Sequence, residues 1–306
     1  MWPKGMPDAR GTVILGWSVA PGRAVSPVER MAPTSRAVAT SLRVYGPGGV
    51  VSDRDWKASF EKTYTGPPSA VAERIWRKVF GDAYPAGLDP NSLVSVDELR
   101  RIASELQLEG GDTFADIGCG RGGAGLWVAA NTGASLVGID IAPAALNAAR
   151  TRAAAMGIED RAEFREGSFE GTGLDSGTVD GIMSVDALLF ALDKRAALTE
   201  LRRVLRPEGR LVFTSWDYHR QPEGRPPQVD DHRPHLQTAR FDVLAYEETE
   251  DWHRRMFETT DALLDHVEEL AAEAAADVEE MRTRLKEMRA TLDAISRRVL
   301  VVASAR

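Results

Sequence analysis

An acid and three alternating glycines stand close together in the run Phe114–Gly123, FADIGCGRGG. Asp116 precedes Gly118 by two residues, and Gly120 and Gly122 follow at alternate positions. Glycines allow positive φ angles and let a ligand approach backbone N–H groups closely. A carboxylate at the mouth of such a loop repels a pyrophosphate and attracts a cationic group. The run therefore predicts a loop that binds a ligand carrying positive charge.

The glycine spacing by itself leaves other interpretations open. Gly118, Gly120 and Gly123 also satisfy G-x-G-x-x-G, the fingerprint of dinucleotide-binding loops. Glycine-rich turns also arise simply where a chain reverses direction. A site for a cationic ligand, a dinucleotide site and a structural turn therefore all remain at this point.

A regular alternation of short apolar runs and helical patterns surrounds the loop. Strands are predicted at 113–118, 135–140, 162–167, 179–185, 210–216 and 241–247, and the chain closes on a further one, RRVLVVASAR. Helical patterns between them cover 123–131, 143–156 and 193–205. Strands that alternate with helices imply a parallel sheet covered on both faces. The expected fold class is therefore α/β, with a Rossmann-like, seven-stranded and mostly parallel sheet.

The flanking segments differ in character from this alternation. Residues 1–52 are rich in Pro, Gly, Ser, Arg and Ala without a sustained period, which is typical of an irregular extension. One domain is expected over 53–306, with lid helices within 53–105. A 3-4 spacing of apolar residues across 251–296 predicts long helices, as an insertion (248–296) before the last strand. These helices either pack on their own domain, which we favour, or contact another subunit.

The whole pattern resembles class I S-adenosylmethionine-dependent methyltransferases over roughly residues 95–306. In that family the first strand ends in an acid followed by G-x-G-x-G, here DIGCGRG from Asp116. The second strand ends in an acid that binds both ribose hydroxyls, here Asp140 in LVGIDIAP. VDGIMSVDALLF resembles the fourth strand, and ELRRVLRPEGRLVFTSW the helix, turn and fifth strand. The resemblance implies S-adenosylmethionine as the cofactor and an antiparallel last strand.

The resemblance also implies which residues bind the cofactor. A carboxylate at Asp140 suits a diol because it accepts two hydrogen bonds at once, although Asp140 could instead cap the helix that begins at Pro143. Trp56, Phe60 and Tyr64 are expected either to form an aromatic lid, which would stabilise a sulfonium, or simply to pack on the sheet. The expected cofactor-binding residues are Asp116, Gly118, Cys119, Gly120, Gly122, Asp140, Ile141, Ser168, Phe169, Val185 and Tyr64.

Several positions depart from the usual pattern of the family. The loop after the third strand usually carries an acid for the adenine amino group, whereas this chain has Ser168 and Phe169. Phe169 is expected either against the adenine or in the core. Many relatives carry a histidine where this chain has Phe190, so a catalytic histidine is absent there. The motifs of nucleic-acid methylation, an Asn-Pro-Pro-Tyr-type tetrapeptide and a Pro-Cys pair, are absent as well.

Methyl transfer from a sulfonium is an in-line displacement, in which the protein mainly aligns the acceptor and excludes water. An oxygen acceptor often needs a general base. We expect such a base among Asp186, His219 and His253, with Asp186 nearest to the methionine end of the cofactor. His232 and His235 are further candidates, and each histidine alone is more typical of a solvated loop. No metal site is predicted.

Bulk composition restricts the partners. The net charge of −8 argues against nucleic acid, because phosphate binding needs a basic face. No stretch approaches the ~18 apolar residues of a membrane span. The single cysteine, Cys119, excludes an internal disulfide and fits a cytoplasmic protein. A homo-oligomer formed through the N-terminal segment or the helices of 251–296 is left open.

These observations predict methyl transfer from S-adenosylmethionine to a small molecule. A natural-product, isoprenoid or lipid-like acceptor is expected, methylated on oxygen, nitrogen or carbon. One alternative is a protein of this fold that catalyses a cyclisation or acts as a non-methylating scaffold. The other is a nicotinamide-dependent dehydrogenase, which the glycine spacing also allows.

Overall fold

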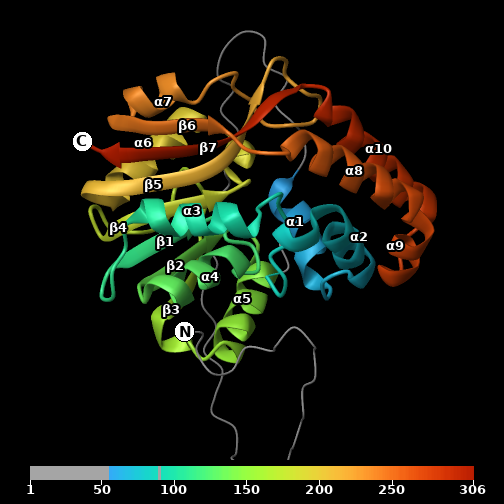
Figure 1. The fold of residues 1–306 in the computed structure, drawn as a ribbon, viewed down its shortest axis with the longest axis horizontal. Helices are drawn as coiled ribbons and strands as arrows, with labels where there is room; N and C mark the ends of the chain where they lie inside the picture. Colours follow the sequence, from blue (N-terminus) through green and yellow to red (C-terminus); the bar gives the residue numbers. More distant parts are fainter. Residues whose placement is uncertain (1–54, 89–90) are drawn as a thin grey trace, which may run out of the picture. The chain divides into compact units, whose positions relative to one another are not determined.

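A seven-stranded sheet organises the residues that the computed structural model describes, 55–88 and 91–306 (Figure 1). Its order is β3-β2-β1-β4-β5-β7-β6, and β7 is antiparallel to both of its neighbours while the other pairs are parallel. The strands are β1 Thr113–Ile117, β2 Ser135–Asp140, β3 Ala162–Glu166, β4 Val179–Val185, β5 Leu205–Tyr218, β6 Phe241–Glu248 and β7 Ile295–Ala305. The expected fold class and the antiparallel last strand are confirmed. The expected extension over 1–52 lies outside the described residues, and its boundary stays a prediction.

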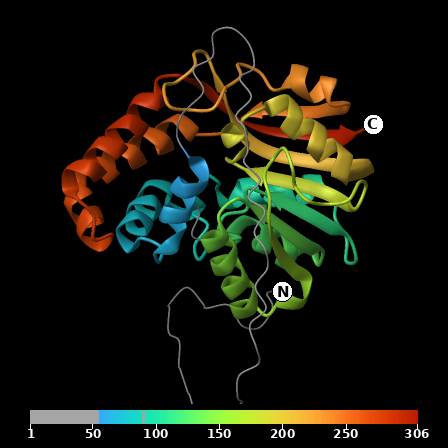
Figure 2. The same cartoon turned by 180° about the vertical axis from the view of Figure 1, so that it is seen from behind.

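Helices cover both faces of this sheet, as Figures 1 and 2 show from opposite sides. On one face, apolar residues of the sheet form a core with α3, α4 and α5. On the other face, they form a second core with α6 and α7. The helices are α1 Trp56–Thr65, α2 Ala70–Phe80, α3 Val96–Leu106, α4 Gly123–Thr132, α5 Pro143–Ala155, α6 Lys194–Val204, α7 Arg233–Thr238, α8 Trp252–Asp265, α9 Val267–Glu273 and α10 Val278–Leu292, with short 3-10 turns η1 Gly81–Ala83, η2 Glu159–Arg161 and η3 Leu188–Phe190.

Local sequence signals explain where several of these elements begin. The Ser95 hydroxyl accepts from the Glu98 N–H while the Glu98 carboxylate accepts from the Ser95 N–H, a capping box that begins α3 as expected. The expected turn before the fifth strand becomes a bulge inside β5. Glu208 has a φ of 65° there, and β5 begins at Leu205 because that residue already pairs with Val179 of β4.

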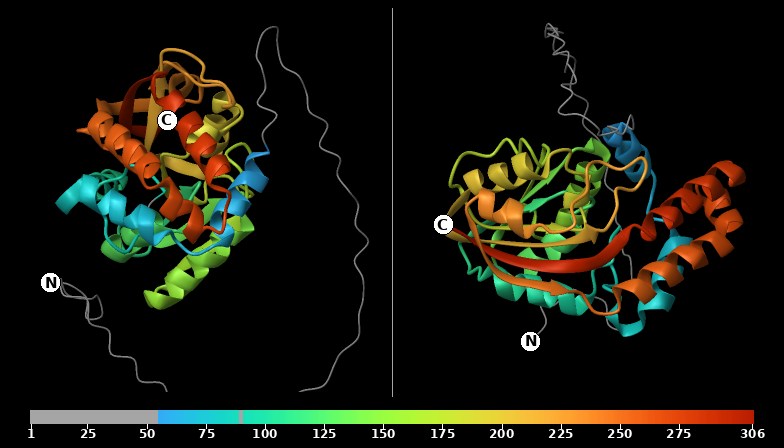
Figure 3. Two further views of the ribbon diagram at one scale, coloured as in Figure 1. Left: turned by 90° about the vertical axis from the view of Figure 1, so that its right-hand side faces the viewer. Right: turned by 90° about the horizontal axis from the view of Figure 1, so that it is seen from above.

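The predicted long helical region divides into α8, α9 and α10. Their apolar residues pack around Ile75 of α2, so that Leu263, Val267, Leu270 and Leu285 form one buried cluster with it. Figure 3 shows these helices beside α2 at the carboxyl-end side of the sheet. The favoured interpretation, packing on the same domain, is therefore confirmed for the apolar face. We call α1, α2 and α8–α10 together the cap.

None of the helices in the described residues is both long enough and apolar enough to cross a membrane.

Candidate functional site

The glycine loop joins β1 to α4 and has a tightly fixed backbone. Gly118, Gly120 and Gly122 have φ angles of 75°, 52° and 74°, a region that L-residues rarely adopt. The N–H groups of Gly118 and Cys119 both donate to the Ile139 carbonyl of β2, at 2.8 and 3.1 Å. The sequence therefore places its glycines where the turn requires positive φ, and β2 holds the loop in place.

Two of the glycines also have no room for a side chain. A Cβ on Gly118 would lie 2.5 Å from the Cβ of Ala187, the second residue after β4. A Cβ on Gly123 would lie 2.1 Å from the carbonyl oxygen of Leu88, which precedes α3. Gly118 is thus required by the close approach of two loops at the sheet edge. Gly123, the third glycine of the dinucleotide-like pattern, is required by chain packing.

Two buried carboxylates end the neighbouring strands β1 and β2. Asp116 is 2% exposed and Asp140 is 8% exposed. Burial raises the pKa of Asp116 to about 7, the charge of Asp140 raises it further, and a backbone hydrogen bond from Gly125 opposes both. Burial also raises the pKa of Asp140 against its backbone hydrogen bonds. Within 55–88 and 91–306 neither carboxylate forms an ion pair, so this edge suits a cationic ligand.

Asp140 fixes the two loops around it. One carboxylate oxygen accepts from the Gly120 N–H at 2.8 Å, and the other accepts from the Ala142 N–H at 3.0 Å. The N-cap residue of α5 is Ala142, without a side-chain capping bond, so Asp140 is not the helix cap. A carboxylate oxygen has more than one lone pair, so Asp140 can accept further hydrogen bonds besides those from the backbone.

The remaining predicted cofactor residues, Cys119 included, lie on the loops and strand ends at this edge. The Phe169 ring lies 3.4 Å from a Cβ placed on Gly118 and also packs in the core with Ile139, so both expected contacts are compatible. Ser168 is half-buried and donates its N–H to the Gly171 carbonyl. Ile141 and Val185, which follow β2 and end β4, are half-buried. Burial raises the pKa of the Cys119 thiol, which suits a small packing residue.

Helix α1 lies across the loops that follow three strands. The Tyr64 hydroxyl would be 3.0 Å from a Cβ on Gly120, in the loop after β1. The Glu61 carboxylate accepts from the Ala144 N–H at the start of α5, at 3.0 Å, and Lys57 pairs with Glu166 at the end of β3. This arrangement places Tyr64 directly on the glycine loop, as expected for a lid. Burial raises the pKa of Tyr64 to about 12, so its phenol stays protonated.

The three predicted bases are not brought together. Asp186 accepts from Arg298 through both oxygens, at 2.8 and 3.0 Å, and from the Leu93 N–H at 2.9 Å. His219 and His253 are exposed, and the His253 ring stacks on Phe257 with centroids 4.2 Å apart. Across the described residues no hydrogen bond, ion pair or ring contact joins any two of the three. Asp186 does not suit the role of general base, because its oxygens are already occupied.

The other two histidine candidates also fail as bases. His232 is buried beside Phe213, and burial lowers the pKa of its imidazole to about 4. Within the described residues, the Nδ1 atom of His235 is buried and makes no hydrogen bond. His232 therefore stays neutral inside the protein rather than facing an acceptor.

An aromatic cluster beside the end of β5 was not predicted from the sequence. It consists of the buried residues Phe80, Tyr84, Leu93, Leu189, Trp216, Tyr218, Trp252 and Ala294. Within the described part of the chain the Tyr218 hydroxyl makes no hydrogen bond, and burial raises the pKa of that phenol to about 12. Trp216 and Tyr218 share one face of β5. Extending the period-2 pattern of apolar residues beyond Trp216 would therefore have indicated this aromatic cluster.

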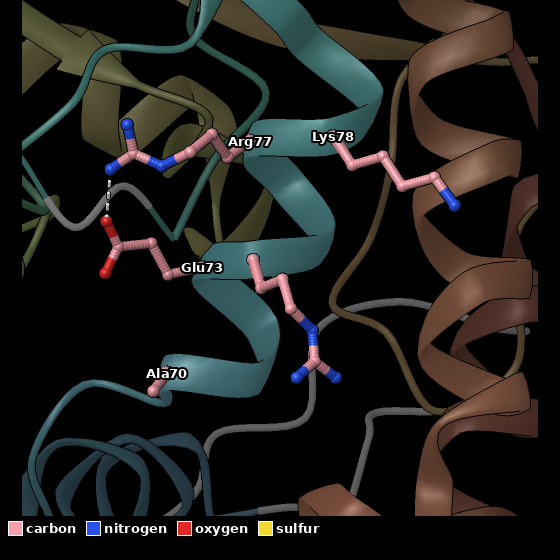
Figure 4. A pocket seen from close by; sticks show the side chains of 5 residues that line it. Ala70, Glu73, Arg77 and Lys78 are labelled. Atoms are coloured by element: carbon pink, nitrogen blue, oxygen red, sulfur yellow. Dashed lines mark hydrogen bonds and ion pairs between the residues drawn. The ribbon is translucent and has the colours of Figure 1, made fainter.

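A separate hollow of about 450 Å³ lies along α2 (Figure 4). Its lining residues are Ala70, Glu73, Arg74, Arg77 and Lys78. Arg77 pairs with Glu73 at 2.6 Å, the contact drawn in Figure 4, and Arg74 pairs with Glu269 of α9 at 2.7 Å. No residue of the glycine loop or the strand ends lines this hollow, and two of its cations are already paired. The strand-end carboxylates remain the better site.

Comparison with known proteins agrees with this geometry. Residues 115–213 match the family model of a methyltransferase domain. The methyltransferase GfsG of Streptomyces halstedii is 29% identical over 129 residues, which cover 42% of this chain and 46% of that protein. The chloroplastic tocopherol O-methyltransferase of Arabidopsis thaliana is 27% identical over 159 residues, which cover 46% of each chain. The chain thus spans about half the length of these curated relatives.

Solved structures show the same fold at lower identity. The crystal structure of the 4+2 cyclase SpnF aligns with a TM-score of 0.63 and 19% identity, covering 81% of this chain and 95% of that one. The residues matched by the domain model run from β1 through the glycine loop and Asp140 to Phe213 of β5, and so contain the elements that build the site. Residues 115–213 thus form a methyltransferase domain by their match to the family model, and the solved structure shares the fold of the chain.

Proposed function

We propose that the protein transfers a methyl group from S-adenosylmethionine to a small and largely apolar acceptor. One observation carries the proposal: Asp116 and Asp140 are buried at adjacent strand ends, without an ion pair among the described residues. A ligand with a cationic amino-acid group and a ribose diol matches two such carboxylates. A dinucleotide would instead bring its pyrophosphate next to this negative charge.

The residues at this edge have complementary roles in the proposal. Asp116 would attract the cationic end of the cofactor, and the free lone pairs of Asp140 would accept from the ribose hydroxyls. Gly118, Gly120 and Gly122 let the ligand approach the backbone, as described for helix-opening loops. The half-buried Ser168, Ile141 and Val185 complete the walls, with the Phe169 ring on the adenine side. When bound, S-adenosylmethionine supplies a methyl group already activated as a sulfonium.

The cap would exclude water from the reacting groups. The Phe190 ring packs edge-on against Phe60 of α1 with centroids 4.9 Å apart, and it lies 4.9 Å from the ring of Trp56. Phe190 stands where many relatives carry a histidine, so this chain has a closed aromatic contact in place of a base. Tyr64 extends the same surface over Gly120. The catalytic contribution in this proposal is alignment and desolvation.

The aromatic cluster supports an apolar acceptor. Its buried side chains come from the end of β5 and from cap helices α2 and α8, and we propose that the acceptor lies against them. The Tyr218 phenol, protonated because burial raises its pKa to about 12, can donate a hydrogen bond to the one polar atom of such a molecule. The named substrate of one relative, tocopherol, belongs to this chemical class.

Calorimetric titration with S-adenosylmethionine and S-adenosylhomocysteine, with NADH and NADPH in parallel, tests the cofactor. We expect Asp140→Asn to weaken binding of S-adenosylhomocysteine more than about tenfold, because it removes a charge-assisted acceptor. Asp242→Asn is the control, since Asp242 is an exposed carboxylate paired with Arg306 at the far edge of the sheet. Tight binding of a nicotinamide cofactor, or unchanged affinity in Asp140→Asn, contradicts the proposal.

Radiolabelled methyl transfer to a panel of phenolic and isoprenoid acceptors tests the reaction. A second candidate function, cyclisation without methyl transfer, is favoured by one observation: no base is assembled near the site from Asp186, His219 or His253. Cofactor binding without transfer to any acceptor would support this second function.

Net charge and cysteine content support further proposals about partners and location. The net charge of −8 supports a protein without a nucleic-acid partner, and the single buried thiol at Cys119 supports a cytoplasmic location. A homo-oligomer through the outer surface of α8–α10 or through the N-terminal segment is tested by light scattering.

A further inference from the structure

Arg298 of β7 is a fully buried cation that joins three segments. It is 1% exposed. Its guanidinium donates to both oxygens of Asp186, to the Glu98 carboxylate and, at 3.1 Å, to the Thr249 hydroxyl. The carboxylates hold the pKa of Arg298 above its usual range despite burial. The planar guanidinium can satisfy all three acceptors at once, which a lysine ammonium cannot do in this geometry.

Asp186 holds the turn after β4 in an unusual conformation. Its φ is 50°, in the left-handed region that a non-glycine residue adopts only when its surroundings fix it. Its N–H donates to both the carbonyl and the hydroxyl of Thr214 in β5, at 3.1 and 3.0 Å. Its carboxylate is held by Arg298 and by the Leu93 N–H. Backbone and side chain of Asp186 are therefore anchored independently.

This turn bears directly on the glycine loop. The next residue, Ala187, has its Cβ 2.5 Å from the position that a Cβ on Gly118 would take, so the two backbones are in close contact. A change in the conformation of Asp186 would move Ala187 against or away from Gly118. The ion pair of Asp186 with Arg298 is thus coupled to the loop through one residue.

The same ion pair also anchors two of the three connections between the cap and the rest of the described domain. Leu93 and Glu98 belong to the segment that leads from α2 and η1 into α3. Thr249 lies between β6 and α8, and its N–H donates to the Arg298 carbonyl at 2.9 Å. These two connections therefore meet at the ion pair of Arg298 with Asp186, next to the turn that touches Gly118.

We propose that Asp186 and Arg298 are positioning residues, which hold the glycine loop in its cofactor-binding conformation and fix two of the three cap connections to it. This inference rests on the proposed function. Asp186 acts through Ala187 on Gly118, and Arg298 acts through Asp186. Asp186 therefore has a positioning role in place of the role of base that the sequence suggested.

The neighbouring residue in β7 provides a matched control. Arg297 donates to Asp217 at 2.8 Å, and the Tyr246 hydroxyl donates to the same carboxylate at 2.6 Å. The Asp217 side chain is 0% exposed and the Asp186 side chain 5% exposed. Successive side chains of a strand point to opposite faces, so this pair lies on the other face of the sheet from Arg298. It offers the same chemistry without contact to Gly118.

The test compares Asp186→Asn with Asp217→Asn. Affinity for S-adenosylhomocysteine is measured by calorimetry, KM and kcat by methyl transfer, and folding by thermal denaturation. Asparagine tolerates the left-handed conformation but loses the charge. We expect Asp186→Asn to raise Kd and the KM for S-adenosylmethionine about tenfold, because apparent affinity falls with the fraction of protein in the binding conformation, while kcat changes less than about threefold. Arg298→Lys should give an intermediate loss.

The outcomes separate the two proposals. If the wild-type protein does not bind S-adenosylhomocysteine, the proposed function fails. If the wild-type protein binds it and Asp186→Asn binds it equally well, the positioning role fails. Equal losses in Asp186→Asn and Asp217→Asn also overturn the inference, because the effect would then reflect general destabilisation. Should Asp186→Asn not fold, Arg298→Lys decides the question, since it retains the buried charge.

Discussion

The glycine loop and the cap are held by different kinds of interaction. Backbone groups hold the loop: Gly118 and Cys119 donate to Ile139, and Gly120 donates to Asp140. Helix α1 of the cap has no fully buried residue, and its ion pair between Lys57 and Glu166 joins side chains that are each 53% exposed. Exposed ion pairs contribute little to stability. The loop is therefore preorganised, whereas α1 is held by partly exposed side chains and is expected to open more readily.

The largest effect is expected from adding a side chain to the glycine loop. Gly118→Ala needs a φ of 75° and places a Cβ 2.5 Å from Ala187. We expect a loss of about 100-fold in affinity for S-adenosylhomocysteine by calorimetry, equivalent to about 2.7 kcal/mol. Gly157→Ala is the matched control, because it shares a positive φ of 66° but has open space around it. It should lower the melting temperature alone, and an equal loss of affinity there would show that strain, not crowding, matters.

A second prediction concerns the charge at the loop. Burial raises the pKa of Asp116 to about 7. A cationic ligand binds the ionised form, so affinity for S-adenosylhomocysteine should rise about tenfold between pH 6 and pH 8. Asp116→Asn should flatten this dependence, leaving only the part due to Asp140. Calorimetry across that pH range is the measurement, and an identical slope in Asp116→Asn would remove Asp116 from the site.

The same group affects stability with the opposite sign. In the unfolded chain Asp116 ionises near its ordinary value of 3.8, whereas the folded protein retains the proton up to about pH 7. The unfolded state therefore binds fewer protons between these values, and the contribution of Asp116 to stability falls as the pH rises through this window. Without ligand, thermal denaturation of Asp116→Asn should lack that part of the decline.

The smallest expected effect lies in the cap. Tyr64→Ala removes the aromatic ring over Gly120, and we expect about fivefold weaker binding of the cofactor, the scale of one cation–π contact. Tyr64→Phe should stay within about twofold, because the bond from Asn91 to the Tyr64 hydroxyl is long, at 3.4 Å. Titration of both variants is sufficient. A loss in Tyr64→Ala as large as that in Gly118→Ala would erase the distinction between loop and cap.

The parts of the fold and the site that depend on local sequence were predictable. Glycines, capping residues and apolar runs specify turns, helix starts and strands within a few residues of themselves, which is why the loop and Asp140 were found. The partner of Asp186 lies 112 residues away in β7, and only the sheet order brings Arg298 to it. The exposure of His219 and His253 likewise depends on how the cap packs, which no local pattern records.

Gly123 shows how one pattern of letters can serve two unrelated needs. Its hydrogen leaves space for the Leu88 carbonyl, which accepts from Arg152 directly above it. The packing of a neighbouring segment thus requires this glycine, and its match to a dinucleotide fingerprint is a coincidence of spacing. A motif is therefore best divided by what each residue touches: here Gly118 contacts Ala187, Gly120 contacts Tyr64, and Gly123 contacts the Leu88 carbonyl.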